Sequence, residues 1–218
     1  MYLIIIVHEF GHIFFALLFK YKIIKINIYP FGGYSIFQND LNISFIKEFL
    51  VFLGGILFQF ILYLIFKYNI NNYSFIYKVF INYNTSIILF NLIPIIPLDG
   101  SKVINILLNN FISFKYAHLI TIYISYIFVF IMIVLFYNNL NMNIMILLLL
   151  FLLIKEHKIH KYLFNNFLVE RLVKEIRFKK NNFINKLNLN KMMKYRNNIF
   201  IIDNKYISEK EILYKKYN

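Results

Sequence analysis

Two histidines and a glutamate near the N-terminus have the spacing of a metal-dependent hydrolase. Residues 8–12 read HEFGH, so His8 and His12 lie four positions apart. On a helix this spacing places both imidazoles on one face, where they can bind one Zn²⁺ ion. Glu9 follows the first histidine and is placed to take a proton from water at the metal. The flanking residues are almost all apolar, and ionisable groups within lipid are functional candidates because their burial is costly.

Two histidines need a further ligand, and Asp99 is the strongest candidate. It lies in the segment NLIPIIPLDG, residues 91–100, and is the only Asp or Glu between positions 48 and 156. A lone carboxylate at a helix end can also cap that helix or pair with a lysine such as Lys102. The His8–His12 pair favours metal binding over these roles, because it requires an oxygen ligand to complete the site.

The few glycines and prolines indicate where the backbone is constrained. All six glycines and all three prolines fall in four short stretches, which begin at Gly11, Pro30, Gly54 and Pro94. In a chain rich in Ile and Asn, their presence indicates close backbone approaches and helix breaks that other residues do not provide. Breaks before Asp99 would let its carboxylate turn inward. The residues expected to support the site in this way are Asn91, Pro94, Pro97 and Gly100.

The composition is that of a membrane protein. Of 218 residues, 60% are hydrophobic and 16% are charged, against roughly a quarter charged in soluble domains. There is no cysteine, hence no disulfide and no thiolate ligand. Apolar runs that could cross a hydrocarbon core of roughly 30 Å occur five times. The expected fold class is an all-α polytopic membrane protein with about five transmembrane helices, near residues 2–19, 46–66, 79–98, 116–137 and 142–154.

A small β element is expected between the first two apolar runs. Residues 21–45 alternate polar and apolar side chains and contain PFGG at 30–33. Alternation predicts strands and PFGG predicts a turn, so we expect a β-hairpin or re-entrant loop near the membrane surface. Lysines flank this loop, the loop after the third run and the end of the fifth. Five alternating spans would place all of them in the cytoplasm, with Met1 on the far side.

The C-terminal part is basic. From Lys155 onward, 16 Lys and Arg face 6 Asp and Glu, which gives +10 of the total charge of +14. We predict a transmembrane domain over 1–154 and a basic, cytoplasmic α/β tail over 155–218. Attraction to the lipid bilayer explains basic residues directly after an apolar run more simply than nucleic-acid binding, and no nucleic acid is expected as a partner.

HEFGH in one span and NLIPIIPLDG in a later one resemble the motif pair of the site-2 protease family of intramembrane zinc metalloproteases. The stretches HEFGHIFFALLFKYKIIKINIYPFGG and NYNTSIILFNLIPIIPLDGSK are most similar to its endospore-former branch. The resemblance implies that His8, His12 and Asp99 bind Zn²⁺ and that Glu9 is catalytic. It also matches residues 54–57 to the family's Gly-Pro-Leu segment, with Ile56 in place of the usual proline.

The resemblance carries further expectations. The hairpin residues that would receive a substrate strand are Pro30, Phe31, Gly32 and Gly33. The implied substrate is a membrane-associated precursor of a sporulation sigma factor, cleaved near the cytoplasmic face of the membrane around the forespore, with inhibitory membrane proteins as partners. The tail, with NIFIIDNKYISEKEIL, is a possible remnant of a CBS-type domain. The relatives carry another transmembrane segment before the HExxH helix, so we expect a truncated chain or a misplaced start.

Two other functions agree with the same residues. One is a catalytically inactive membrane scaffold that keeps the motif. The other is a zinc-binding transporter, although a transporter should place polar residues along several spans and here they concentrate in two. His157 and His160 beside Glu156 have the spacing of a second metal site, but the surrounding lysines favour a solvated helix end at the membrane interface.

Overall fold

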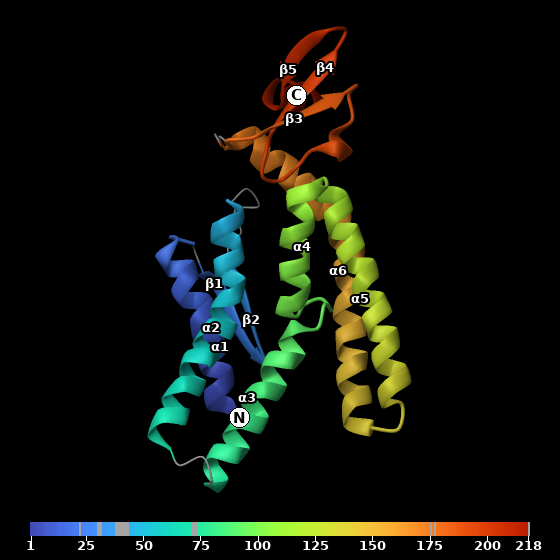
Figure 1. Ribbon diagram of the computed structural model, residues 1–218. Coiled ribbons are helices and arrows are strands. Elements are labelled where there is room, and N and C mark those ends of the chain that lie inside the picture. The colour runs from blue at the N-terminus through green and yellow to red at the C-terminus, as the bar shows by residue number, and fades with distance from the viewer. Residues whose placement is uncertain are drawn as a thin grey trace. The chain divides into compact units, whose positions relative to one another are not determined.

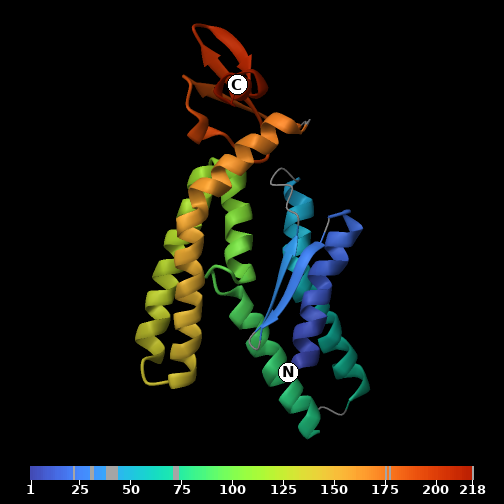
Figure 2. The same cartoon turned by 180° about the vertical axis from the view of Figure 1, so that it is seen from behind.

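The computed structural model describes residues 1–217 apart from 22, 30–31, 38–43, 71–73, 175 and 177. The chain forms two compact units, one of residues 1–39 and 46–103, the other of residues 40–45 and 104–218. Figures 1 and 2 show the elements of each unit from opposite sides. The first unit contains α1 (Tyr2–Leu18), β1 (Ile23–Tyr29), β2 (Gly32–Phe37), α2 (Phe45–Asn69), α3 (Phe75–Leu92) and the first turn of α4 (Asp99–Phe111).

A two-stranded hairpin lies beside the first helix. Strand β1 pairs antiparallel with β2, with Ile26 opposite Ser35 and Tyr29 opposite Gly32. This is the hairpin that the alternating pattern of residues 21–45 predicts. Strand β2 contacts α1, the helix that carries HEFGH, as both views show (Figure 2). Gly32 and Gly33 begin β2, whereas Pro30 and Phe31 lie outside the described residues.

Glycines let the backbones of α1 and α2 touch. A Cβ atom on Gly54 would lie only 2.8 Å from the carbonyl carbon of Gly11, and a Cβ on Gly11 would lie 2.6 Å from the carbonyl carbon of Gly54. Real Cβ atoms do not approach backbone this closely, so both positions require glycine. The glycines that the sequence marks as points of close approach are therefore opposite each other.

The helix break before Asp99 follows from two prolines. Helix α3 ends at Leu92, earlier than the apolar run at 79–98, and α4 begins at Asp99. Pro94 and Pro97 lie in the short connection, and the Ile96–Pro97 peptide is cis. A Cβ on Gly100 would lie 2.7 Å from the carbonyl oxygen of Ile93, so glycine is needed where α4 starts against the end of α3. The break predicted from the prolines is present.

The second unit combines a helical hairpin with a small mixed sheet. Helices α5 (Phe114–Phe136) and α6 (Leu140–Val173) run side by side and antiparallel (Figure 1). The chain then forms β3 (Asn181–Asn185), the 3-10 turn η1 (Leu189–Lys191), β4 (Asn197–Ile202), β5 (Lys205–Ser208) and α7 (Glu209–Tyr217). Strand β3 pairs parallel with β4, and β4 pairs antiparallel with β5. Helix α6 passes residue 154, the predicted domain boundary, without a break.

One core joins the helical hairpin to the tail sheet. The rings of Phe114 in α5 and Phe167 in α6 stack with centroids 4.4 Å apart. Phe167, Leu168, Phe200 and Leu213 are all fully buried in the same cluster, which thus draws on α6, β4 and α7. Burial of a large apolar side chain contributes about 1.5–3 kcal/mol, so this shared core is a substantial part of the stability of the unit.

Arg171, near the end of α6, lies inside this unit. Only 1% of its surface is exposed, and its guanidinium donates to the carbonyl oxygens of Met193 at 2.9 Å and Lys194 at 2.6 Å. It also donates to Glu209 Oε1 at 3.2 Å. Burial lowers the pKa of Arg171, and Glu209 opposes that shift. The side chain therefore ties α6 to the 193–196 turn and to α7.

The described helices agree in part with the predicted spans. Helices α2 and α5 are long and apolar enough to cross a membrane, with mean hydropathies of 2.5 and 2.7, and α1 is a shorter apolar helix. Helices also occupy the other predicted runs, as α3 and α6. The structure is mostly helical with a small C-terminal sheet, as expected, but the number of five spans is not confirmed.

Substitution of Arg171 by methionine is expected to destabilise the tail. Glu209 and two carbonyl oxygens would lose a buried charged donor, which costs roughly 3–5 kcal/mol. We expect a lower unfolding temperature and faster proteolysis within 179–217. Lys174→Met is the matched control, because its 4.0 Å pair with Glu170 is at the surface and such pairs contribute little. Equal proteolysis of both variants would contradict this role of Arg171.

Candidate metal centre

Three ligand atoms from two distant segments meet in the first unit. The Nε2 atoms of His8 and His12 lie 3.1 Å apart, and each lies 2.9 Å from Oδ2 of Asp99. All three residues are buried, with 3–5% of their surface exposed. Ligand atoms around a tetrahedral zinc ion, at about 2.0–2.2 Å from the metal, are roughly 3.3–3.6 Å apart. A small outward movement of these atoms therefore gives the spacing that zinc requires.

The other ring nitrogens determine which atoms face the centre. His12 Nδ1 is 2.8 Å from the backbone carbonyl oxygen of Val51, and His8 Nδ1 is 2.8 Å from Oε1 of Gln59. Both partners are acceptors, so in each neutral ring the proton is on Nδ1 and the lone pair is on Nε2. Two lone pairs and a carboxylate oxygen thus converge on one point. This donor set fits a cation such as Zn²⁺, with His8, His12 and Asp99 as its ligands.

Gly55 keeps the space beside the two imidazoles open. A Cβ atom there would lie 2.5 Å from Cε1 of His8 and 2.6 Å from Nε2 of His12. The second of these is a ligand atom, so even one methyl group would intrude on the position of the metal. The Gly54–Gly55 pair therefore has two functions, contact with Gly11 and clearance for the histidines.

Two charged residues border the ligands. Glu9 is buried next to His8 on α1, with 6% of its surface exposed. Lys102, one turn after Asp99 on α4, donates to Oδ1 of Asp99 at 3.0 Å, and its ammonium lies 4.9 Å from the ring centre of Phe52. Asp99 thus directs one oxygen to the histidines and the other to a lysine. The sequence offers metal binding and pairing with Lys102 as alternatives, and the structure shows that one carboxylate can do both.

The predicted site residues are distributed around this centre. Pro94, Pro97 and Gly100 form or follow the connection that brings Asp99 inward, and Asn91 is half-buried one residue before the end of α3. Gln59 and Asn84 were not predicted, although both are buried and hydrogen-bonded to each other at 3.5 Å. No spacing motif in the sequence identifies an isolated amide in a helix as part of a metal site. The one sequence feature that could have identified these residues is that each lies within a predicted apolar run, where burying a polar side chain costs free energy.

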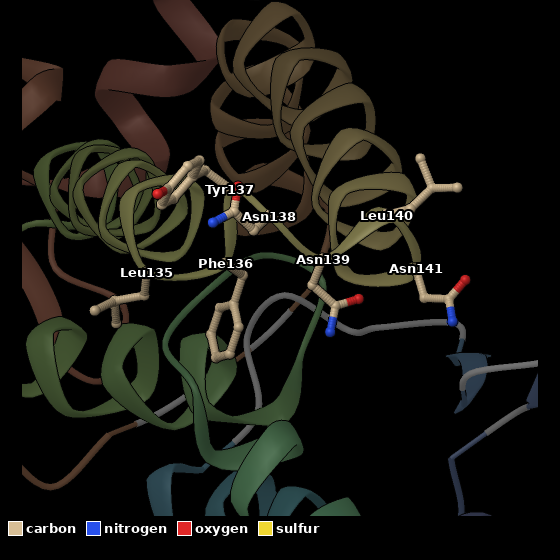
Figure 3. A pocket seen from close by; sticks show the side chains of 7 residues that line it. All are labelled: Leu135, Phe136, Tyr137, Asn138, Asn139, Leu140 and Asn141. Atoms are coloured by element: carbon tan, nitrogen blue, oxygen red, sulfur yellow. The ribbon is translucent and has the colours of Figure 1, made fainter.

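Other polar clusters do not form a comparable centre. Among the described residues, His8, His12 and Asp99 are the only group of three such side chains close enough for one metal ion. His157 Nδ1 contacts the hydroxyl of Tyr126 at 3.2 Å, and His160 Nδ1 donates to the carbonyl oxygen of His157 at 2.7 Å. A hollow of about 360 Å³ at the α5–α6 turn (Figure 3) is lined by residues 135–141, which include no histidine or carboxylate.

Comparison with known proteins supports the metal centre. The sequence profile of Peptidase family M50 matches residues 1–74, which contain HEFGH. Stage IV sporulation protein FB of Bacillus subtilis is 34% identical over 121 residues, which are 53% of this chain and 41% of that protein. A zinc metalloprotease of Methanocaldococcus jannaschii is 31% identical over 120 residues, 53% of this chain and 34% of that protein.

One solved structure is similar to most of the chain. The site-2 protease from Methanocaldococcus jannaschii matches with a TM-score of 0.54 and 25% identity, over 81% of this chain and 77% of that one. The matched region spans less than half of each of the two curated relatives. The resemblance to site-2 proteases that the two motifs predict is confirmed, and it extends to the fold.

Gly55→Ala is expected to abolish or strongly weaken metal binding. The added methyl group would overlap both imidazoles, and the adjoining backbone contact of Gly54 with Gly11 leaves little room for adjustment. Zinc content of the purified protein measures this directly. Ile61→Ala, on an exposed position of the same helix, should keep its zinc. A Gly55→Ala protein with a full complement of zinc would show that the histidines do not bind metal where the structure places them.

Asp99→Ala is expected to lower the zinc content to well below one ion per chain. Removal of the carboxylate leaves two imidazoles, and catalytic zinc sites generally use three protein ligands. Metal analysis after gel filtration gives the result. Asp203→Asn removes a carboxylate from an exposed position in the tail and serves as the control. Unchanged zinc in Asp99→Ala would remove Asp99 from the ligand set.

Proposed function

We propose that this chain, which resembles the family M50 peptidases across its metal-binding motif, is an intramembrane zinc metalloendopeptidase. The observation that carries the proposal is the convergence of His8 Nε2, His12 Nε2 and Asp99 Oδ2 within 3.1 Å of one another, beside a buried glutamate. Zinc peptidases hold their metal with three protein ligands and leave a position for water or substrate. His8, His12 and Asp99 form such a set of three protein ligands.

The reaction follows from the arrangement of the residues. A zinc ion held here would polarise the scissile carbonyl and lower the pKa of a bound water to roughly 7. Glu9 takes the proton of the attacking water and passes it to the leaving amine as the peptide bond breaks. His8 and His12 keep their Nδ1 protons directed to Gln59 and Val51, so their other nitrogens stay available as ligands. Lys102 holds the second oxygen of Asp99 and so orients that carboxylate.

The substrate must be extended at the site of cleavage, because a helix hides its amide bonds. The hairpin of β1 and β2 supports this requirement, since it presents strand backbone beside the helix that carries the site. We propose that the substrate adds as a further strand to this hairpin, around Gly32 and Gly33 and the adjoining Pro30 and Phe31. Hydrogen bonds along the backbone would then hold many sequences in the same extended form.

The similarity to stage IV sporulation protein FB suggests the class of substrate. We propose a membrane-associated precursor of a sporulation sigma factor, cleaved near the cytoplasmic face, in the membrane around the forespore. Inhibitory membrane proteins as partners and a multi-pass topology with a cytoplasmic tail belong to the same proposal. The apolar helices α2 and α5 and the basic residues after position 154 support a place in the bilayer.

The two rival functions make different demands on the site. An inactive scaffold keeps the ligands without needing Glu9. A zinc transporter needs polar groups along a path, whereas the buried polar side chains Gln59 and Asn84 in α2 and α3 are linked to the metal ligands by hydrogen bonds. A test of Glu9 therefore separates the protease from both.

Glu9→Gln is expected to lower cleavage by roughly 10²–10⁴-fold, because general acid–base catalysis contributes about that much. Wild type and variant would be co-expressed with a candidate membrane-associated pro-protein, and processing followed by immunoblot. The variant should keep its zinc, since Glu9 is not among the three ligands. Glu48→Gln makes the same chemical change elsewhere in the first unit and should process normally. Equal processing by Glu9→Gln and wild type would refute the protease proposal.

A further inference from the structure

Two buried amides extend the metal centre into the next two helices. Gln59 on α2 is fully buried, and 3% of Asn84 on α3 is exposed. Helix α2 is apolar and long enough to span a membrane. An amide in such surroundings costs several kcal/mol unless it is hydrogen-bonded, so its partners indicate its role.

The hydrogen bonds run in one direction, with His8 donating to Gln59 and Gln59 donating to Asn84. Gln59 Oε1 accepts from Nδ1 of His8 at 2.8 Å, and Gln59 Nε2 donates to Oδ1 of Asn84 at 3.5 Å. The amide of Gln59 thus presents its oxygen to the imidazole and its nitrogen to Asn84. If the amide turned over, its NH₂ group would face the N–H of His8, and that contact would be repulsive.

The two histidines are oriented by different kinds of partner. His12 Nδ1 donates to a backbone carbonyl, that of Val51, which is fixed by helix α2. His8 depends instead on a glutamine side chain with three rotatable bonds. A flexible acceptor orients a ring only if something holds the acceptor, and Asn84 is the side chain placed to do so.

We infer that Gln59 is a positioning residue for His8 and that Asn84 keeps the Gln59 amide in the orientation that accepts the His8 Nδ1 proton. The inference rests on the proposed zinc site. In this arrangement α1, α2 and α3 are linked by His8, Gln59 and Asn84, and a short connection after α3 leads to Asp99 at the start of α4. The two amides thus tie the histidine ligands to the segment that supplies the carboxylate.

Zinc affinity of the purified protein, measured by competition with a chelator, tests whether Gln59 and Asn84 support the metal site. Gln59→Met keeps the length of the side chain but removes the acceptor, and should weaken zinc binding about 10–100-fold. Gln59→Glu restores an acceptor oxygen and should recover most of that loss. Asn84→Leu should weaken binding by a smaller factor, because Gln59 is present but no longer held. Asn82→Leu, at an exposed position two residues away on α3, is the matched control.

The tautomer of His8 can be measured, and a variant that only disturbed helix packing would leave it unchanged. In the zinc-free protein, ¹⁵N spectra of labelled histidine should show the Nδ1–H form at His8 for wild type and Gln59→Glu, and a mixture of tautomers for Gln59→Met. Normal zinc affinity in Gln59→Met would overturn the inference, as would a Gln59→Glu protein as weak as Gln59→Met. A wild-type chain that binds no zinc would instead contradict the proposed function itself.

Discussion

Three electron-rich atoms converge in an apolar setting, and the rest of the first unit depends on this convergence. The lone pairs of His8 and His12 and an oxygen of Asp99 repel one another unless a cation lies between them. Burial strengthens that repulsion, because little water is present to screen it. The neighbouring side chains and glycines hold these atoms together, and a divalent metal bound between them would make the arrangement favourable.

Glycines and prolines, which act on the backbone locally, bring residues that are far apart in the sequence into this centre. Glycines at 11 and 54 bring α1 against α2, so that the histidines reach the acceptors on α2. Prolines at 94 and 97 end α3 early, so that Asp99 opens a new helix with its carboxylate directed inward. The buried amides Gln59 and Asn84 are connected by hydrogen bonds to His8 of this centre, whereas a zinc transporter would need polar groups along a path across the membrane.

Much of the site could be predicted from the sequence because its signals are local or rare. The spacing of His8 and His12 places them on one helix face, and Asp99 stood out as an isolated carboxylate in a long apolar stretch. Gln59 and Asn84 could not be found this way, because their roles depend on contacts between helices far apart in the chain. The continuation of α6 to Val173 was also missed, since its later turns are stabilised by packing of Phe167 and Leu168 against the tail rather than by lipid.

The core shared by α5, α6 and the tail has a consequence for how such proteins can be recombined. Phe167, Leu168 and Arg171 on α6 are covered by residues that follow position 178. A chimera that joins this tail to another membrane domain at the apolar boundary near residue 154 would separate both halves of that core. The compact unit that contains this core extends over residues 104–218, so the helical hairpin and the tail should be exchanged together as one structural piece.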